Sequence, residues 1–448
     1  MSAPKRLLLV ASTTGYQTRV FAEEAARVGY ELRLATDRCH VLEDPWGDRA
    51  IAVRFDDACG AAETIARECA GALDGIVAVG DRPAWLAALA AERLGLPYNS
   101  PGSVEAARNK YLSRERFRAA GLAVPGYRRV ALDAAPRGAA ADARYPCVLK
   151  PLGLSASRGV IRADDAAQFI AAFERIRTLL AAPEVMRLHD GADRYLQVED
   201  FIPGREFALE GLLTDGRLRV LALFDKPDPL DGPFFEETIY TTPSRASAAT
   251  QAAIVDTTQR AIEALGLTRG PVHAEMRINH AGVWMLEVAA RPIGGLCAKT
   301  LRFAGAQRVR RAPPSEPGTA SRRTPFCASA LEDVSLEEVI LRHAAGEQIG
   351  PLHPVSPASG VMMIPVPHDG VYRGVSGSSE AGAVTGMEEV VITAKPGQAL
   401  LGLPEGASYL GFLFARGGNA PEVESALRAA HAQLKFEIAT ALPVRPPG

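Results

Sequence analysis

The sequence lacks the features that mark several large classes of protein. Its 448 residues contain no apolar run long enough to cross a membrane and no apolar leader beyond a short LLLVA stretch. Lysine and arginine (50) nearly balance aspartate and glutamate (52), so neither nucleic acid nor a membrane surface is indicated as a partner. The six cysteines form no CxxC pair and no metal-ligand spacing, which is typical of a reducing compartment. We therefore expect a cytoplasmic protein.

Two common nucleotide-binding motifs are also absent. The loop after the first expected strand reads STTGYQTR and lacks GxGxxG, so a dinucleotide-binding fold is not supported. The phosphate-binding pattern GxxxxGK[ST] does not occur either. Any phosphate site in this chain must therefore be built in another way.

The length predicts about three domains. In residues 1–100 apolar strands alternate with amphipathic helices, which predicts a βαβ domain with a parallel sheet. The expected strands are 6–11, 31–35, 51–55 and 75–79, and the expected helices are 18–28, 57–70 and 83–94. Asp81 follows the last strand, at the edge where such sheets bind ligands. Aspartate is also a common helix N-cap, and that role is favoured here.

The next region, residues 101–303, begins with a predicted helix over 101–120 that Ser103 could cap and that carries Lys110. A short buried strand then ends at Lys150 and is followed by the loop PLGLSASRG. A strand-end lysine beside a Gly/Ser loop can hold phosphates through its charge and through backbone N–H groups. A surface hairpin loop would have the same composition.

Residues 270–295 predict a β-hairpin with a three-residue turn ending at a glycine. This turn length places Glu275 opposite Glu287, and His273 opposite Ala289, on one face of the hairpin. A turn one residue longer would send the two glutamates to opposite faces.

Two facing carboxylates repel unless a cation lies between them. Hard oxygen ligands in this arrangement suit Mg²⁺, so Glu275 and Glu287 are candidate metal ligands. Arg291 follows at the strand end, where its guanidinium could hold a phosphate or a carboxylate. The alternative is a solvated hairpin in which the two glutamates pair with Arg277.

The last third changes character twice. Residues 301–329 contain six arginines, at positions 302, 308, 310, 311, 322 and 323, among Pro, Ser, Gly and Thr, which indicates a linker or insert over about 304–330. Residues 331–448 predict a small α+β domain without a cluster of chemically active side chains.

Taken in order, these pieces resemble the ATP-grasp superfamily. The resemblance rests on Lys110, YPCVLKP, the Gly/Ser loop, QVEDFIPGREF and the paired glutamates followed by arginine, and it covers about residues 100–303. The segments SGVMMIPVP, VVITAKPGQ and GASYLGFLFARG resemble the C-terminal domain of L-amino-acid ligases. The resemblance implies a two-lobed nucleotide-binding fold with a mobile lobe at about 125–205.

The resemblance also implies an activity, that of an ATP- and Mg²⁺-dependent carboxylate–amine ligase. Such an enzyme forms an amide bond through an acyl phosphate, with small-molecule carboxylate and amine substrates, and dimers are common in the group. Two alternatives stay open: a ligase for a carboxylate that is not an amino acid, and a nucleotide-binding protein without turnover.

The resemblance assigns roles to individual residues. Those implied to bind ATP are Lys110, Lys150, Ser155, Ser157, Gly159, Glu199, Asp200, Ile202 and Glu206. Those implied to bind Mg²⁺ are Glu275 and Glu287, while Arg291 would steady the phosphoryl group and the substrate carboxylate. Glu237 is a candidate to take a proton from the amine.

Two positions depart from the pattern. Ala289 stands where many relatives have an asparagine metal ligand, which puts a second metal ion in doubt. Tyr240 stands where amino-acid ligases often have the histidine of an ExxH motif, so the amine pocket is expected to differ.

Overall fold

The computed structural model describes residues 3–12, 17–37, 46, 49–186, 191, 194–304 and 333–440. The linker predicted at 304–330 lies outside these ranges, apart from Ala304. No helix within them is long and apolar enough to cross a membrane.

The N-terminal part is a four-stranded parallel sheet in the order β3-β2-β1-β4, which confirms the predicted βαβ architecture. Its elements are β1 (Arg6–Ala11), α1 (Thr18–Val28), β2 (Glu31–Thr36), β3 (Ala50–Ala52), α2 (Ala58–Cys69), β4 (Gly75–Val79) and α3 (Asp81–Leu94). The apolar run of β1 is buried from Leu7 to Ala11 because strands and helices cover it on both sides.

Two helices, α4 (Pro101–Arg108) and α5 (Lys110–Ala119), replace the single helix predicted over 101–120. The helix is interrupted at Asn109, whose side chain accepts hydrogen bonds from two backbone N–H groups in the first turn of α5. Ser100, rather than Ser103, caps α4. Hydrophobic spacing continues through the break, so only the capping potential of asparagine could have indicated it. The break makes Lys110 the first residue of a helix.

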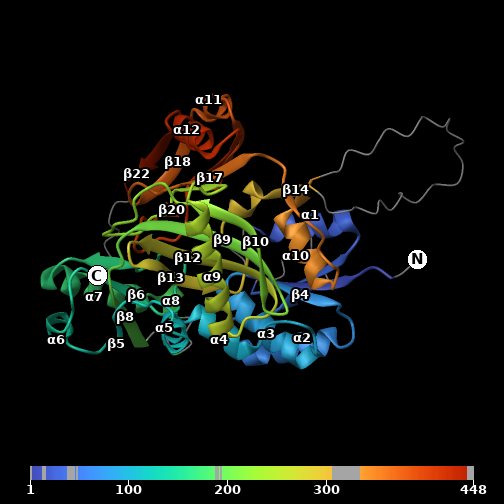
Figure 1. Cartoon of the computed structure of the whole chain (residues 1–448), viewed down its shortest axis with the longest axis horizontal. Coiled ribbons are helices and arrows are strands. Elements are labelled where there is room, and N and C mark those ends of the chain that lie inside the picture. Colours follow the sequence, from blue (N-terminus) through green and yellow to red (C-terminus); the bar gives the residue numbers. More distant parts are fainter. Residues whose placement is uncertain are drawn as a thin grey trace, which may run out of the picture.

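A small antiparallel sheet follows, in the order β5-β8-β6-β7, and lies within the lobe expected at about 125–205. Its elements are β5 (Tyr127–Ala131), α6 (Pro136–Ala141), β6 (Cys147–Pro151), β7 (Ile161–Ala163), α7 (Ala166–Leu180), α8 (Pro183–Met186) and β8 (Tyr195–Asp200). Phe169, Phe173 and Ile176 of α7 are fully buried against this sheet. In Figure 1 it lies at the opposite side of the molecule from the N-terminus.

The centre of the molecule is an eight-stranded antiparallel sheet in the order β13-β12-β9-β10-β11-β17-β21-β19. The elements from its middle section are β9 (Arg205–Thr214), β10 (Arg217–Asp225), β11 (Ile239–Thr242), α9 (Ala248–Leu265), β12 (Gly270–Asn279) and β13 (Gly282–Ala289). The strands from the C-terminal section are β17 (Ala358–Ile364), β19 (Met387–Ile392) and β21 (Gly411–Gly417). The C-terminal part thus extends the central sheet, through the pairing of β11 with β17.

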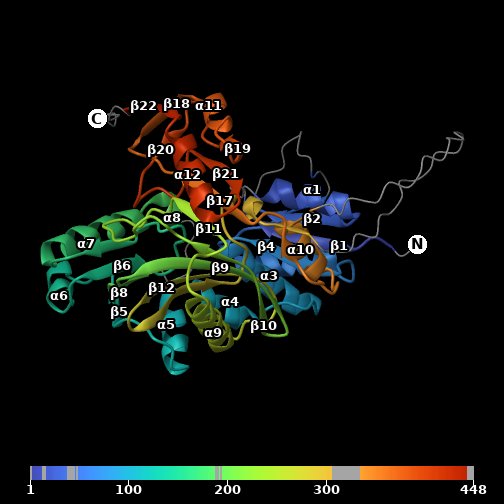
Figure 2. The same cartoon turned by 45° about the horizontal axis from the view of Figure 1, so that its top comes forward.

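The remaining elements lie around this sheet. In Figures 1 and 2, α11, α12 and β18 lie at the top of the molecule, and the N-terminal sheet lies at the right. The remaining elements are η3 (Cys297–Thr300), β14 (Arg302–Ala304), β15 (Val334–Ser335), α10 (Leu336–Ala344), β16 (His353–Pro354), β18 (Gly370–Ser376), α11 (Ser378–Gly382), β20 (Ala399–Leu400), α12 (Ala420–His431) and β22 (Lys435–Ala439). The domain boundaries drawn from the sequence stay a prediction.

Candidate active site

A cavity of about 400 Å³ lies where the N-terminal sheet, the small sheet and the central sheet meet. Twelve of the thirteen site residues named from the sequence line it: Lys110, Lys150, Ser155, Ser157, Glu199, Asp200, Ile202, Glu206, Glu237, Glu275, Glu287 and Arg291. The volume is within the range of small-molecule sites, about 300–1,000 Å³. Residues spread over more than 180 positions of sequence are therefore brought together by tertiary packing.

The β12–β13 hairpin places Glu275 opposite Glu287, as the sequence predicted. The predicted three-residue turn is wrong, however, since Asn279 pairs directly with Gly282 and leaves a two-residue turn. The register then shifts by one residue at a β-bulge that contains Leu286. Without this extra residue Glu287 would face the opposite side of the hairpin. The bulge therefore places the carboxylates of Glu275 and Glu287 on the same face of the hairpin.

Arg114 of α5 holds this bulge. The residue is 1% exposed, and its guanidinium donates to the backbone carbonyl of Leu286 at 3.0 Å and to the carboxylate of Glu199 at 2.7 Å. Glu199 also pairs with Lys150. Burial alone would raise the pKa of Glu199, but the charges of Arg114 and Lys150 outweigh it and lower that pKa to about 2. The carboxylate of Glu199 thus fixes the position of Lys150.

Two lysines reach the cavity from different elements. Lys150 lies on β6, and burial lowers its pKa although Glu199 acts in the opposite direction. Lys110 starts α5 and donates from Nζ to the carbonyl oxygen of Leu154 at 2.6 Å. The two ammonium groups lie close enough for each to oppose the other's charge. Such a pair favours an anionic ligand.

The Gly/Ser loop between β6 and β7 forms one wall of the cavity. Ala156 and Ser157 have left-handed backbones, with φ of 56° and 54°, which is rare for residues other than glycine. Gly159 is the one named site residue that does not line the cavity. It donates its N–H to Pro404 at 2.8 Å, and a Cβ there would come within 2.7 Å of Pro151. Gly159 therefore serves the packing of the loop.

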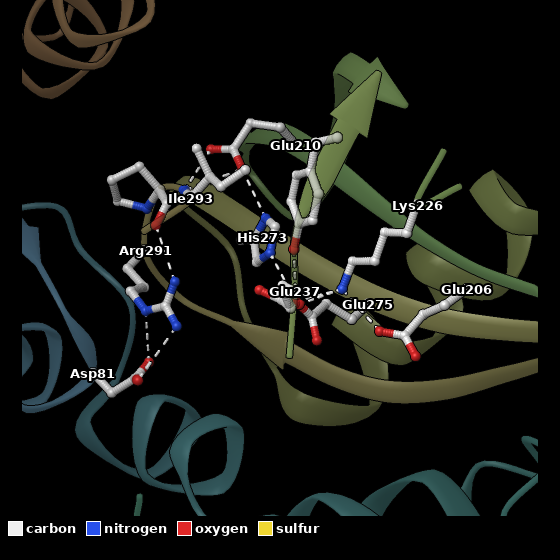
Figure 3. A network of polar contacts seen from close by, with 11 residues as sticks. Asp81, Glu206, Glu210, Lys226, Glu237, His273, Glu275, Arg291 and Ile293 are labelled. Carbon is white, nitrogen blue, oxygen red and sulfur yellow. Dashed lines mark hydrogen bonds and ion pairs between the residues drawn. The ribbon is translucent and has the colours of Figure 1, made fainter. Parts of the chain in front are cut away.

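Lys226 forms the centre of a buried cluster that the sequence analysis missed. Its ammonium lies 2.8 Å from Glu206 and 3.1 Å from Glu275, and it also pairs with Glu237 (Figure 3). Burial alone would lower the pKa of Lys226, but these three carboxylates raise it well above its usual value. A signal was present, because the sequence FDKP at the end of β10 repeats the strand–Lys–Pro pattern of VLKP at Lys150.

The cluster fits a cation. Glu206, Glu237 and Glu275 offer oxygen atoms that all lie within 4.8 Å of one another, and a lysine ammonium already lies among them. Arg277 pairs with Glu206 at 2.9 Å, so the alternative in which it neutralises the two hairpin glutamates is wrong. Oxygen donors at this spacing suit Mg²⁺ as well as an ammonium group.

His273 links this cluster to the next strand. Its Nδ1 lies 3.1 Å from Glu210 and its Nε2 lies 3.4 Å from Glu275. Burial alone would lower the pKa of His273, but hydrogen bonds to Glu210 and Glu275 raise it to about 9. The imidazole is therefore charged at neutral pH and donates from both nitrogens.

Arg291 connects the hairpin to the N-terminal sheet. Its Nε donates to Asp81 at 2.9 Å and its Nη2 to the same carboxylate at 3.4 Å. The prediction that Asp81 caps a helix is wrong, since Gly80 is the N-cap of α3 and no side chain caps it. Burial alone would raise the pKa of Asp81, and the charge of Arg291 lowers it. The alternative position, at a strand end that binds ligands, agrees with its place in the cavity wall.

The small sheet and the central sheet, with strand-end lysines and facing carboxylates between them, define this chain as a protein of the ATP-grasp fold. Residues 143–300 match the model of the ATP-grasp domain, and residues 362–439 match that of the L-amino acid ligase C-terminal domain 2. The chain therefore contains an ATP-grasp domain followed by an L-amino acid ligase C-terminal domain, which confirms the resemblance drawn from the sequence.

Individual relatives are similar to parts of this chain. The uncharacterized protein y4rH of Sinorhizobium fredii is 24% identical over 343 residues, which are 77% of this chain and 64% of the relative. The alanine–anticapsin ligase of Bacillus subtilis is 28% identical over 220 residues, 46% of each chain. The aligned part thus spans between about half and two thirds of these relatives.

Solved structures share the fold over nearly the whole chain. The L-amino acid ligase of Bacillus licheniformis superposes with a TM-score of 0.75 at 23% identity, covering 98% of this chain and 100% of that one. Other structures with this fold contain ATP or MgADP.

Proposed function

We propose that the protein is an ATP-dependent carboxylate–amine ligase that forms an amide or peptide bond, with an amino acid as one substrate. The observation that carries the proposal is the convergence of two cavity-facing lysines, the Glu275–Glu287 pair and Arg291 on one cavity. The matching L-amino acid ligase C-terminal domain supports an amino-acid substrate.

The nucleotide would lie between the small sheet and the central sheet. Lys110 and Lys150 would hold its phosphates, with Ser155 and Ser157 closing over them from the Gly/Ser loop. Since Arg114 and Lys150 occupy the carboxylate of Glu199, contacts to the base would come from the backbone between Asp200 and Ile202.

The ribose and metal positions follow from the carboxylates. Glu206 reaches the cavity beside Lys226 and would hold the ribose. Glu275 and Glu287 would hold Mg²⁺, and Ala289 offers no third ligand on the hairpin. Bound there, Mg²⁺ would neutralise phosphate charge during transfer.

A carboxylate is a poor acyl donor, because oxide is a poor leaving group. Attack of a carboxylate oxygen on the γ-phosphorus breaks the bond to the bridging oxygen and releases ADP, which leaves an acyl phosphate. The amine nitrogen then attacks the acyl carbon, phosphate leaves, and the amine gives up a proton. Arg291 would steady the transferred phosphoryl group by charge. Glu237, beside Lys226 in the cavity wall, would receive the proton.

The experiment that tests this function measures phosphate release from ATP and Mg²⁺ with pooled amino acids. Release that requires both a carboxylate and an amine, with an amide product by mass spectrometry, is the expected result. Release with a carboxylate but without dependence on an amino acid would indicate the ligase for another carboxylate. Binding of ATP with no release in any pool would contradict catalysis altogether.

A further inference from the structure

The carboxyl ends of β1 and β4 form a part of the cavity to which the proposed reaction assigns no substrate. In the order β3-β2-β1-β4 the chain runs from β1 to β2 and β3 on one side, while β4 lies on the other side of β1. Open parallel sheets bind ligands outside the strand ends at such a reversal. Gln17 follows β1, Asp81 follows β4, and both line the cavity.

Gln17 has a half-satisfied amide. The residue is 2% exposed, and its Nε2 donates to the backbone carbonyl of Ile293 at 2.6 Å. Its Oε1 is buried and has no hydrogen-bond partner in the part of the chain that the structure describes. The carbonyl of Ile293 fixes this orientation, because a flipped amide would bring two acceptors together. Buried polar atoms in native proteins are nearly always paired, so this oxygen lacks the donor that its burial calls for among the described residues.

The Nε2 of the same amide is held by the segment that carries Arg291. Arg291 and Ile293 belong to one short turn, which Asp81 and Gln17 hold from the N-terminal sheet. The N–H of Ile293 is in turn held by Glu210 at 3.2 Å. Gln17 thus contacts the segment that carries Arg291, the residue proposed to steady the phosphoryl group.

An amide oxygen favours the amino group of a substrate over its other polar groups. It accepts hydrogen bonds and repels the oxygens of phosphates and carboxylates, whereas an amino group supplies N–H donors. It is also uncharged. A carboxylate at this place would favour the protonated ammonium form, which is no nucleophile, while a neutral acceptor orients the free amine without that penalty.

We propose that Gln17 binds the amine substrate, its Oε1 accepting a hydrogen bond from the attacking nitrogen or from an N–H beside it. The inference rests on the proposed ligase function and adds a binding residue from the N-terminal sheet. The amine would then approach from the strand ends of β1 and β4, past Arg291.

The test uses the full chain and separates formation of the acyl phosphate from capture by the amine. Hydroxylamine is a small nucleophile that traps acyl phosphates as hydroxamates at high concentration, without a binding site of its own. Hydroxamate formation with single amino acids first identifies the best carboxylate substrate. Free amino acids are then varied as the amine at saturating levels of that carboxylate and ATP.

We expect Gln17→Leu to raise the KM of the amine by about 10-fold or more, the effect of a lost hydrogen bond in a buried site, while hydroxamate formation and the KM of ATP stay at wild-type values. Arg19→Ala is the matched control, because Gln17 is the N-cap of α1 and Arg19 lies in the first turn of that helix, with its side chain 87% exposed. It should leave both reactions unchanged.

Three results would overturn the inference. An unchanged KM of the amine in Gln17→Leu would exclude the contact. A raised KM of the carboxylate would assign Gln17 to the other substrate. An equal loss of hydroxamate and amide would show that Gln17 only positions the turn of Arg291. A wild-type protein that forms no hydroxamate with any carboxylate would instead refute the ligase function itself.

Discussion

Replacing Arg114 with methionine tests how far the bulge, Glu199 and Lys150 depend on one buried side chain. Methionine retains part of the apolar stem but removes the charge and the bonds at 2.7 Å to Glu199 and 3.0 Å to the carbonyl of Leu286. Glu199 would then lie 2% exposed with Lys150 as its remaining counter-charge. Lys150 would then be held less firmly, and the β12–β13 hairpin would lose a contact that fixes its register.

The size of the effect follows from these contacts. Removing one partner of a buried ion pair costs about 3–5 kcal/mol. Since Lys150 still neutralises Glu199, the lower part of that range applies. The unpaired carbonyl of Leu286 adds about 1–3 kcal/mol. We expect Arg114→Met to lower the free energy of unfolding by about 4 kcal/mol and to raise the KM of ATP, because Lys150 loses its fixed orientation.

The same helix offers a matched control. Arg118 pairs with Glu115 at 2.8 Å, but its side chain is 62% exposed, so Arg118→Met should cost no more than about 1 kcal/mol. Urea denaturation measures both variants. An Arg114→Met variant as stable as Arg118→Met would refute the reasoning. Adding Glu199→Gln to Arg114→Met should cost less than the sum of the single changes, because the two side chains interact directly.

Three further predictions concern the metal, the loop and the response to acid. Glu287→Gln should abolish Mg²⁺-dependent turnover while thermal unfolding stays unchanged; full turnover in a steady-state assay would exclude the Glu275–Glu287 metal site. Glu405 pairs with Arg175 on α7 and follows Pro404, whose carbonyl accepts a hydrogen bond from Gly159 in the Gly/Ser loop. Glu405→Ala should raise the KM of ATP a few-fold, with a loss of stability below about 1 kcal/mol. An unchanged KM of ATP would contradict a role of the C-terminal part in supporting the Gly/Ser loop. The pKa of Glu199 lies at about 2, below the usual 4.5, so its ion pairs stabilise the fold above pH 4.5 and lose a contribution on the order of 3 kcal/mol as the pH falls towards 2. In urea titrations at several pH values, Glu199→Gln should therefore lose less stability than the wild type between pH 4.5 and 2. An equal loss of stability in both proteins would contradict the assignment.

Much of the fold was readable from local pattern. Strand–helix alternation predicted the parallel N-terminal sheet. The sequence also predicted correctly that Glu275 lies opposite Glu287, although from the wrong turn geometry. A three-residue turn and a two-residue turn followed by a bulge give the same register, and a sequence alone does not distinguish them.

The errors have physical reasons too. The break at Asn109 changes no hydrophobic spacing, so periodicity could not reveal it. The role of Asp81 depends on Arg291, which lies 210 residues away and has no local signature. Lys226 was passed over because its three carboxylate partners come from β9, β12 and the loop before β11, and only the central sheet brings them together.

The sequence by itself determined which chemical groups the chain carries and in what order: a helix lysine, a strand-end lysine, a small-residue loop, and two acidic positions on one hairpin face. These follow from periodicities of two and 3.6 residues and from the preferences of single residues, which act over a few positions. The tertiary structure decided which of these groups touch. Burial of Arg114, the charge balance around Lys226 and the unpaired amide oxygen of Gln17 all arise where separate sheets meet, and the energies of such contacts depend on distances that no local pattern encodes.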